Sequence, residues 1–372
     1  MKRGGQRGIA LVLVTWVFMI LGVLALDFAR YMRDDAEAAV NLAEETRNYY
    51  VAVGAMNRAI YDLEQGEHGD VGNEKEEKDE EEEDEGTEAG GQPAEGGLDD
   101  ADLTAADGEW HEEVLNGARF GVRVTDEGAL ISLNDAAQEV GATLLRHVVK
   151  MLLGYGGTAG MDRGGDVEIS TVVDSIVDWY DRNDEEGVHG AESRFYLDRE
   201  PPYPAKNGDF DSIEELLQVR GVTPALYYGS NGMPGLKDVF TPYVVTKAEH
   251  PKVNLQRAPA AVLQALLGID AEEAAELIEL RQDQDPEVFR TQVLERLRTV
   301  DPVIAEQTKG GGPPKVVRVE ARADVSVPRN QARVAAVVKL TSEISEGIVI
   351  MRWFDRAPWQ GGLPTGSGDG PA

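Results

Sequence analysis

An uncharged run of eighteen residues, Ile9–Leu26, constrains this chain more than any other feature of its sequence. A helix of that length rises about 27 Å at 1.5 Å per residue, which nearly spans a hydrocarbon core of about 30 Å. A cleaved secretory signal has a shorter apolar region followed by a small-x-small motif, and no such motif follows Leu26. The run therefore predicts a membrane helix that is retained in the mature protein.

The residues after this run continue a helical pattern to about Leu63. They contain no proline, and small or apolar residues recur close to helical spacing. We expect one helix over residues 9–63, roughly 80 Å long, apolar in its first third and amphipathic beyond. Lys2, Arg3 and Arg7 precede the apolar run. The positive-inside rule therefore predicts a cytoplasmic N-terminus and an exported C-terminal domain.

Charge is concentrated in one segment. The formal net charge is −32, and residues 64–109 alone contain twenty acidic residues and two lysines. A segment with charge of one sign and no apolar periodicity predicts a disordered linker over residues 64–108. A chain this acidic repels phosphate backbones, so nucleic acid is not an expected partner. The sequence has no cysteine, which excludes disulfides and thiolate metal sites.

Strand patterns appear on both sides of a long helical region. Apolar residues alternate around the turn signal Asn116-Gly117, a short strand is expected at residues 130–134, and three more are expected at 316–321, 333–340 and 348–354. The pattern predicts an α+β fold in which a small antiparallel sheet is split by a large helical insertion. The expected segments are a leader (1–8), the long helix (9–63), the acidic linker (64–108), the first strands (109–134), the helical insertion (135–312), the last strands (313–357) and a flexible tail (358–372).

The insertion contains two helix–glycine–helix units, around Gly221 and Gly268, in a helix-hairpin-helix or SAM-like arrangement. A capping box formed by Ser212 and Glu215 is expected to start one helix. Such hairpins can bind DNA phosphates at a helix N-terminus, usually with nearby lysine or arginine. Around Gly221 the only cation is Arg220, and Asp209, Asp211, Glu214 and Glu215 are close by. We therefore expect protein packing, and a membrane-anchored DNA-binding or DNA-uptake protein is the alternative.

Acidic side chains gather after one predicted helix of the insertion. Asp178 and Asp181 lie three residues apart at the helix end, so both can face the same way, and Asp184 and Glu192 follow in a glycine-containing loop. Hard oxygen ligands from a helix end and a loop suit Ca²⁺, although the spacing is not that of an EF-hand. A solvated acidic loop is the alternative. No motif of an enzyme nucleophile or of catalytic zinc is present, so we expect no enzymatic activity, and an anchored calcium-dependent hydrolase has no motif in its favour.

The first residues of the apolar run resemble a known processing signal. A short basic leader that ends in glycine, Gln6-Arg7-Gly8, directly precedes Ile9, as in type IV pilins and the pseudopilins of type II secretion. The resemblance implies that prepilin peptidase cuts after Gly8 and methylates Ile9. The fifth mature residue would be Leu13, where most pilins carry glutamate. Among pseudopilins, a chain that lacks this glutamate resembles the minor subunit at the tip of the pseudopilus.

The insertion resembles the helical domain of the general secretion pathway protein K family. The matching positions are Asp178, Trp179, Asp181, Gly190, Ala191, Glu192, Tyr196, Asn207, Gly208, Glu215, Leu216, Val219 and Gly221. The resemblance implies a minor pseudopilin in the bacterial inner membrane that forms the pseudopilus tip and supports protein export. The implied partners are other minor pseudopilins, the major pseudopilin, the inner-membrane assembly platform and prepilin peptidase. The implied calcium ligands are Asp178, Asp181, Asp184 and Glu192.

Overall fold

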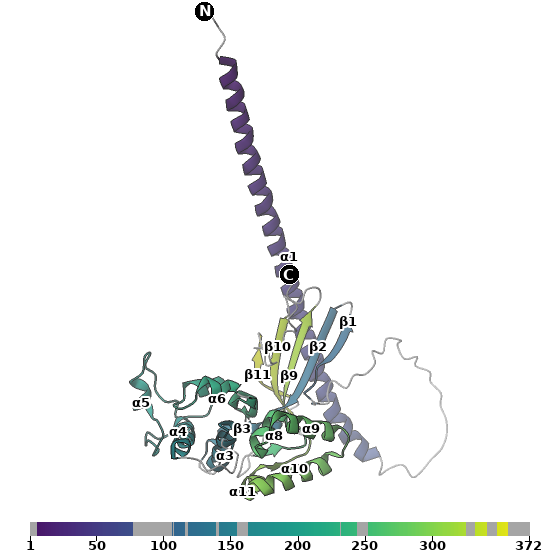
Figure 1. Ribbon diagram of the computed structural model, residues 1–372. Helices are drawn as coiled ribbons and strands as arrows, with labels where there is room; N and C mark the ends of the chain where they lie inside the picture. Colours follow the sequence, from purple (N-terminus) through teal and green to yellow (C-terminus); the bar gives the residue numbers. More distant parts are fainter. Residues whose placement is uncertain are drawn as a thin grey trace, which may run out of the picture.

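The molecule consists of a long helix, a five-stranded sheet and a helical insertion (Figure 1). The computed structural model describes residues 6–76, 106, 108–115, 118–138, 141–154, 163–230, 232–243, 252–324, 332–340 and 348–355, and for residues 6–10, 65–76 and 163–167 it describes the backbone alone. The predicted turn Asn116-Gly117 and the predicted tail from residue 358 lie outside this part of the chain.

Helix α1 (Gln6–Glu76) is longer than the sequence predicts. Its apolar N-terminal half is exposed, and α1 is long and apolar enough to cross a membrane. Residues 64–76, which the sequence assigns to the acidic linker, are helical instead. A helix already fixed by packing extends at little cost, and the glutamates and lysine near its end have high helix propensity.

The sheet has the strand order β1-β2-β9-β10-β11, and every neighbouring pair is antiparallel. Its strands are β1 (His111–Leu115), β2 (Ala118–Asp126), β9 (Val316–Asp324), β10 (Ala332–Lys339) and β11 (Val349–Phe354). The insertion leaves at the end of β2 and returns at the start of β9, which is the strand that pairs with β2. The predicted split sheet is therefore confirmed.

The part of α1 from about residue 48 to residue 63 covers one face of the sheet. Small residues such as Ala52, Ala55 and Ala59 are buried there, which lets the helix approach the strands closely. Alternate residues of the strands, for example Val122 and Val319, face the helix and are fully buried. The period of two in the strand sequences and the helical spacing in α1 together specify this packing.

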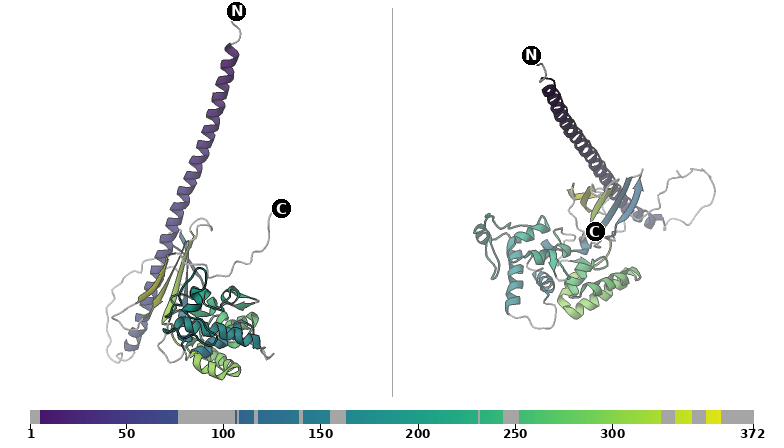
Figure 2. Two further views of the ribbon diagram at one scale, coloured as in Figure 1. Left: turned by 90° about the vertical axis from the view of Figure 1, so that its left-hand side faces the viewer. Right: turned by 45° about the horizontal axis from the view of Figure 1, so that its top comes forward.

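The insertion is built from short helices and two-residue strands. Its elements are η1 (Glu127–Ala129), β3 (Ile131–Ser132), α2 (Leu133–Ala136), α3 (Ala142–Leu152), α4 (Arg163–Tyr180), α5 (Ser193–Leu197), η2 (Ile213–Gln218), α6 (Pro224–Tyr228), β4 (Gly229–Ser230), β5 (Met233–Pro234), α7 (Leu236–Val239), β6 (Phe240–Thr241), β7 (Val253–Asn254), α8 (Ala260–Leu267), α9 (Ala271–Gln282), α10 (Pro286–Val300), α11 (Pro302–Thr308) and β8 (Lys309–Gly310). In both sets of views the insertion lies at the end of the molecule away from the N-terminus of α1 (Figures 1 and 2).

Two predictions inside this region are wrong in detail. The strand expected at residues 130–134 is only β3, which pairs in parallel with β6 of the insertion and not with the main sheet. Leu133 already begins α2, because Ser132 accepts a hydrogen bond from the backbone N–H of Asp135 and caps that helix. The insertion therefore begins before residue 135. The segment after Ser212 is the 3-10 helix η2 instead of an α-helix, although Glu215 does accept a hydrogen bond from the Ser212 N–H.

The sheet and the insertion, which together form the head of the molecule, have separate apolar cores. A group of polar contacts, the junction, joins them. Glu127 is 1% exposed at the end of β2. It accepts hydrogen bonds from Arg318 Nε of β9 at 2.6 Å and from the Thr241 hydroxyl of β6. Beside it, Asn254 Nδ2 of β7 donates to Asp126 Oδ2 at 2.7 Å. Charged and hydrogen-bonded groups thus connect the insertion to the sheet.

Candidate functional site: an acidic cluster at the end of helix α4

Helix α4 carries two acidic side chains to its C-terminal end. Its apolar face, which includes Val172 and Ile176, is buried in the core of the insertion. That packing fixes the rotation of the helix. Asp178 lies in the last turn and is 3% exposed, and Asp181 follows the last helical residue, Tyr180. The two carboxylates therefore lie on the same side, as their spacing predicts.

The loop that follows α4 folds back onto Asp178. The backbone N–H of Gly187 donates to both carboxylate oxygens of Asp178, at 3.0 and 3.2 Å. A Cβ atom added to Gly190 would lie 1.9 Å from Asp178 Oδ2. Gly190 is therefore required for close approach of the backbone to the carboxylate.

Glu192 closes the cluster from the other side. It precedes α5 and is 4% exposed, and neither of its carboxylate oxygens makes a hydrogen bond with any described residue. A buried carboxylate without a well-formed hydrogen bond is costly, because its charge has lost water, and the nearby backbone N–H of Ser193 offsets only a small part of that loss. The orphaned group therefore points to a ligand that the protein alone does not supply.

Three of the four predicted ligands converge. Asp178, Asp181 and Glu192 each offer an oxygen atom, and these atoms lie within 4.8 Å of one another. Burial, followed by the neighbouring carboxylates, raises the pKa of Glu192 to about 7. Burial also raises the pKa of Asp178 to about 6, and the N–H groups of Gly187 and Ala191 offset part of that effect. The arrangement disfavours negative charge unless a cation binds there.

Asp184 lies apart from this group. Its Oδ1 accepts a hydrogen bond from Asn207 Nδ2 at 3.1 Å, and it is exposed. Asn207 has a left-handed backbone (φ 48°) and a buried Oδ1 without a hydrogen-bond partner among the described residues. Its left-handed backbone and its role beside the acidic loop could not be inferred from the sequence, although Asn207-Gly208 is a turn signal. His189 lies in the loop, and its backbone N–H donates to Asp174.

The donor set fits calcium. Carboxylate oxygens from a helix end and a loop are hard ligands, and Ca²⁺ accepts them in flexible geometry. The described residues include no histidine or sulfur ligand within the converging group, so the chemistry does not favour zinc or copper. Asp178, Asp181 and Glu192 are the residues that would hold the ion, and its charge would offset the repulsion among them.

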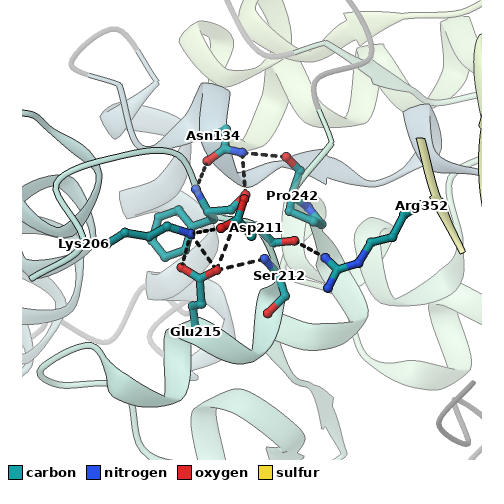
Figure 3. Close-up of polar contacts among 8 residues, drawn as sticks. Asn134, Lys206, Asp211, Ser212, Glu215, Pro242 and Arg352 are labelled. Carbon is teal, nitrogen blue, oxygen red and sulfur yellow. Dashed lines mark hydrogen bonds and ion pairs between the residues drawn. The ribbon is translucent and has the colours of Figure 1, made fainter. Parts of the chain in front are cut away.

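A network of polar contacts joins this region to the sheet (Figure 3). Lys206 Nζ lies 2.7 Å from Asp211 Oδ2 and 2.9 Å from both carboxylate oxygens of Glu215. Arg352 of β11 donates to the backbone carbonyl of Asp211. Asn134 also holds this segment, because its Nδ2 donates to the carbonyls of Phe210 and Pro242 and its Oδ1 accepts a hydrogen bond from the Phe210 N–H. Within the insertion, the segment 206–215 is thereby bound both to Asn134 and to the edge strand β11 of the sheet.

The two helix–glycine–helix units face inward. Gly268 (φ 67°) ends α8, and a Cβ atom there would lie 2.9 Å from Met151 Sδ. Gly221 (φ 86°) packs against Val172 of α4 in the same way. The Arg220 side chain is already engaged within the insertion, since its guanidinium donates to the carbonyl of Gly190. These contacts support the packing role that the charge pattern predicts for the hairpins.

Helix α1 has an apolar N-terminal half long enough to cross a membrane, and its other half packs on an antiparallel sheet with a helical insertion between two neighbouring strands. This architecture supports a membrane-anchored protein. Residues 132–229 match the family model of the type II secretion system protein K, first domain. The match lies within the insertion and supports the resemblance seen in the sequence.

Two known proteins illustrate the similarity. Type II secretion system protein K of Escherichia coli strain K12 is 41% identical over 69 residues, which span 18% of this chain and 20% of that protein. The matched segment thus covers only a fifth of that relative. The crystal structure of the GspK-GspI-GspJ complex from the type 2 secretion system of enterotoxigenic Escherichia coli has a similar chain, with a TM-score of 0.48 and 15% identity, over 67% of this chain and 84% of that one.

Proposed function

We propose that this protein is a minor pseudopilin that forms or initiates the tip of the pseudopilus of a type II secretion system. The observation that carries the proposal is the protein K domain, residues 132–229, inserted into the sheet of a protein anchored by a long apolar helix. The function is structural and supports protein export. Its partners are other minor pseudopilins, the major pseudopilin and the inner-membrane assembly platform.

The shape of the head supports a position at the tip. The insertion lies beyond the sheet, at the end of the molecule away from the apolar half of α1 (Figure 1). A subunit stacked above would have to occupy the same space. In addition, a chain cut after Gly8 has Leu13 at its fifth position, so it offers no buried carboxylate to the terminal ammonium of a neighbour.

Crosslinking tests this position directly. The chain has no cysteine, so Leu42→Cys on the exposed side of α1 provides a single reactive thiol. We expect crosslinks to the helices of other minor pseudopilins in an assembled system. Ala52→Cys, whose side chain is buried against the sheet, is the matched control and should give none. Crosslinks from Leu42→Cys mainly to the major pseudopilin along the shaft would contradict a position at the tip.

Processing and orientation belong to the same proposal. We propose that prepilin peptidase cuts after Gly8 on the cytoplasmic side of the inner membrane and that Ile9 becomes the methylated N-terminus, with the head in the periplasm. Gly8 and Ile9 both lie in the first turns of α1. Mass spectrometry of the mature N-terminus should find methylated Ile9. A mature chain that starts after Leu26 would remove the anchor and contradict the proposal.

We further propose that Asp178, Asp181 and Glu192 bind Ca²⁺, and that Asp184 contributes from the adjacent loop. The proposal is supported by the buried and unpartnered carboxylate of Glu192. Calcium at 100 times its dissociation constant should stabilise the protein by about 2.7 kcal/mol, visible as a higher unfolding midpoint. Glu192→Gln should abolish this shift, whereas Glu272→Gln on the exposed surface of α9 should retain it. A wild-type midpoint that is the same in calcium and in chelator would contradict the site.

A DNA-binding or DNA-uptake function is not favoured. The hairpins pack inward and the chain is strongly acidic. The purified protein should therefore show no binding to duplex DNA at low salt, where even nonspecific binding is strongest. No enzymatic activity is proposed.

A further inference from the structure

We infer that Arg220 is a positioning residue for the acidic cluster: it holds the loop 187–190 closed over Asp178, so that the carboxylates converge before a cation binds. The inference rests on the proposed calcium site. Arg220 lies thirty residues from the loop along the chain, in the turn that follows η2, and it is not one of the ligands.

Arg220 is fixed at both its backbone and its side chain. Its guanidinium donates to the carbonyl oxygen of Gly190 at 2.8 Å and stacks on the ring of Phe195 at 4.8 Å. Its backbone N–H donates to the hydroxyl of Tyr196 at 3.2 Å. Tyr196 is fully buried and its ring packs edge-on against Trp179, at a centroid distance of 5.1 Å. Because Trp179 is next to Asp178 in α4, the loop is tied to the helix that carries the first ligand.

The contact with Gly190 bears directly on the geometry of the cluster. The N–H of Gly190 donates to the carbonyl of Gly187 at 3.1 Å, so the two glycines form one turn. The N–H of Gly187 in turn bonds both oxygens of Asp178. Repulsion among Asp178, Asp181 and Glu192 acts to open this loop when no cation is present. A guanidinium fixed on Gly190 opposes that opening.

The sign of its effect separates positioning from simple electrostatics. A positive charge near the cluster repels Ca²⁺, so if charge alone mattered, removing it would tighten calcium binding. If Arg220 organises the ligands, removing it weakens binding, because groups that orient metal ligands typically contribute 10- to 100-fold to metal affinity. The two possibilities predict opposite changes for the same substitution.

Arg199 provides a matched control. It stacks on the same ring of Phe195, at 4.7 Å, but donates no hydrogen bond to residues 187–190. Arg199→Met therefore removes one positive charge and one stacking contact with Phe195, but neither the hydrogen bond to Gly190 nor the 4.0 Å ion pair of Arg220 with Glu186. Arg220→Lys keeps the charge of Arg220 but loses the planar guanidinium that both stacks and donates.

The experiment uses the full-length protein in detergent, with two readouts. In chelator, hydrogen exchange of the Gly187 and Gly190 amides should be about tenfold faster in Arg220→Met than in wild type, and unchanged in Arg199→Met. Calorimetric titration with calcium should show about tenfold weaker binding for Arg220→Met, weaker binding to a smaller extent for Arg220→Lys, and a change of less than about twofold for Arg199→Met.

The outcomes distinguish this inference from the metal site itself. Wild-type exchange rates in Arg220→Met, or tighter calcium binding by that variant, would overturn the positioning role. A wild-type protein that does not bind calcium would overturn the proposed site. Faster exchange in Arg220→Met would then still establish that Arg220 holds the loop, since that readout needs no metal.

Discussion

The sheet and the insertion each bury an apolar core, but they do so with different kinds of contact. The sheet buries one face against α1 with small, alternating residues such as Ala321 and Val319, and its outer face carries ion pairs such as Arg123–Glu320. The insertion surrounds a larger core with short helices joined by turns and polar side-chain contacts. The first region is specified by a repeating pattern and the second by individual contacts. Substitutions at single contacts should therefore affect the insertion and its junction most.

The junction should show the largest effect. Glu127→Ala removes the partner of Arg318 and leaves a largely buried guanidinium without its carboxylate. Loss of one member of a buried ion pair is strongly destabilising, and we expect a loss of about 3 kcal/mol in the free energy of unfolding. Urea denaturation, monitored by far-UV circular dichroism, measures this loss.

An exposed pair supplies the control for this comparison. Glu112 pairs with Arg322 on the outer face of the sheet, and the Glu112 side chain is 51% exposed. Glu112→Ala should therefore cost less than about 1 kcal/mol. An equal loss in the free energy of unfolding for the two variants would mean that burial does not strengthen the ion pair at the junction.

A smaller effect is expected at the loop of the acidic cluster. Gly190→Ala would bring a methyl group into the carboxylate of Asp178, so the loop must move. Forcing extra volume into a packed site costs about 1–3 kcal/mol. The loss should be confined to the insertion, which hydrogen exchange can measure separately for the insertion and for the sheet. Gly208→Ala, whose added Cβ has its nearest neighbour at 3.9 Å, is the control. Equal protection of the insertion in both variants would contradict the close approach at Gly190.

The same contrast explains what the sequence predicts well. The strands β2, β9 and β10 could be predicted because alternate residues must all face α1. The placement of Asp178 and Asp181 on the same side could be predicted because the two residues are three apart at the end of one helix. These features depend only on neighbours in sequence, and the structure agrees with them.

The remaining features depend on contacts between distant residues. Leu133 and Asn134 are predicted to end the strand 130–134, but they begin α2 instead, because Ser132 caps that helix and the insertion packs around it. The burial of Glu192 and the contact of Arg220 with Gly190 join segments that no local pattern relates. The glycines at 187 and 190 were a signal of this site, but their spacing does not reveal what approaches them.

The smallest effect concerns the pH dependence of stability and the charge of Glu192 within the acidic cluster. In the metal-free protein the raised pKa of Glu192, about 7, means that the folded state takes up a proton more readily than the unfolded chain. Its protonation therefore stabilises the fold fully below the unfolded pKa of about 4.5, and this contribution is lost as pH rises through about 7. His147, whose pKa burial lowers, acts in the opposite direction below its usual value of 6.5, so wild-type stability alone does not report Glu192.

A comparison with Glu192→Gln separates the two groups, since His147 is present in both proteins. Glutamine cannot ionise, so in chelator the variant should be more stable than wild type at pH 8, by on the order of 1 kcal/mol. The difference should shrink as pH falls toward 5, where the wild-type carboxyl is protonated. Urea unfolding at several pH values measures it. A difference that is constant between pH 5 and 8 would mean that Glu192 carries no unfavourable charge in the folded protein, and the case for a cation at this cluster would lose its electrostatic basis.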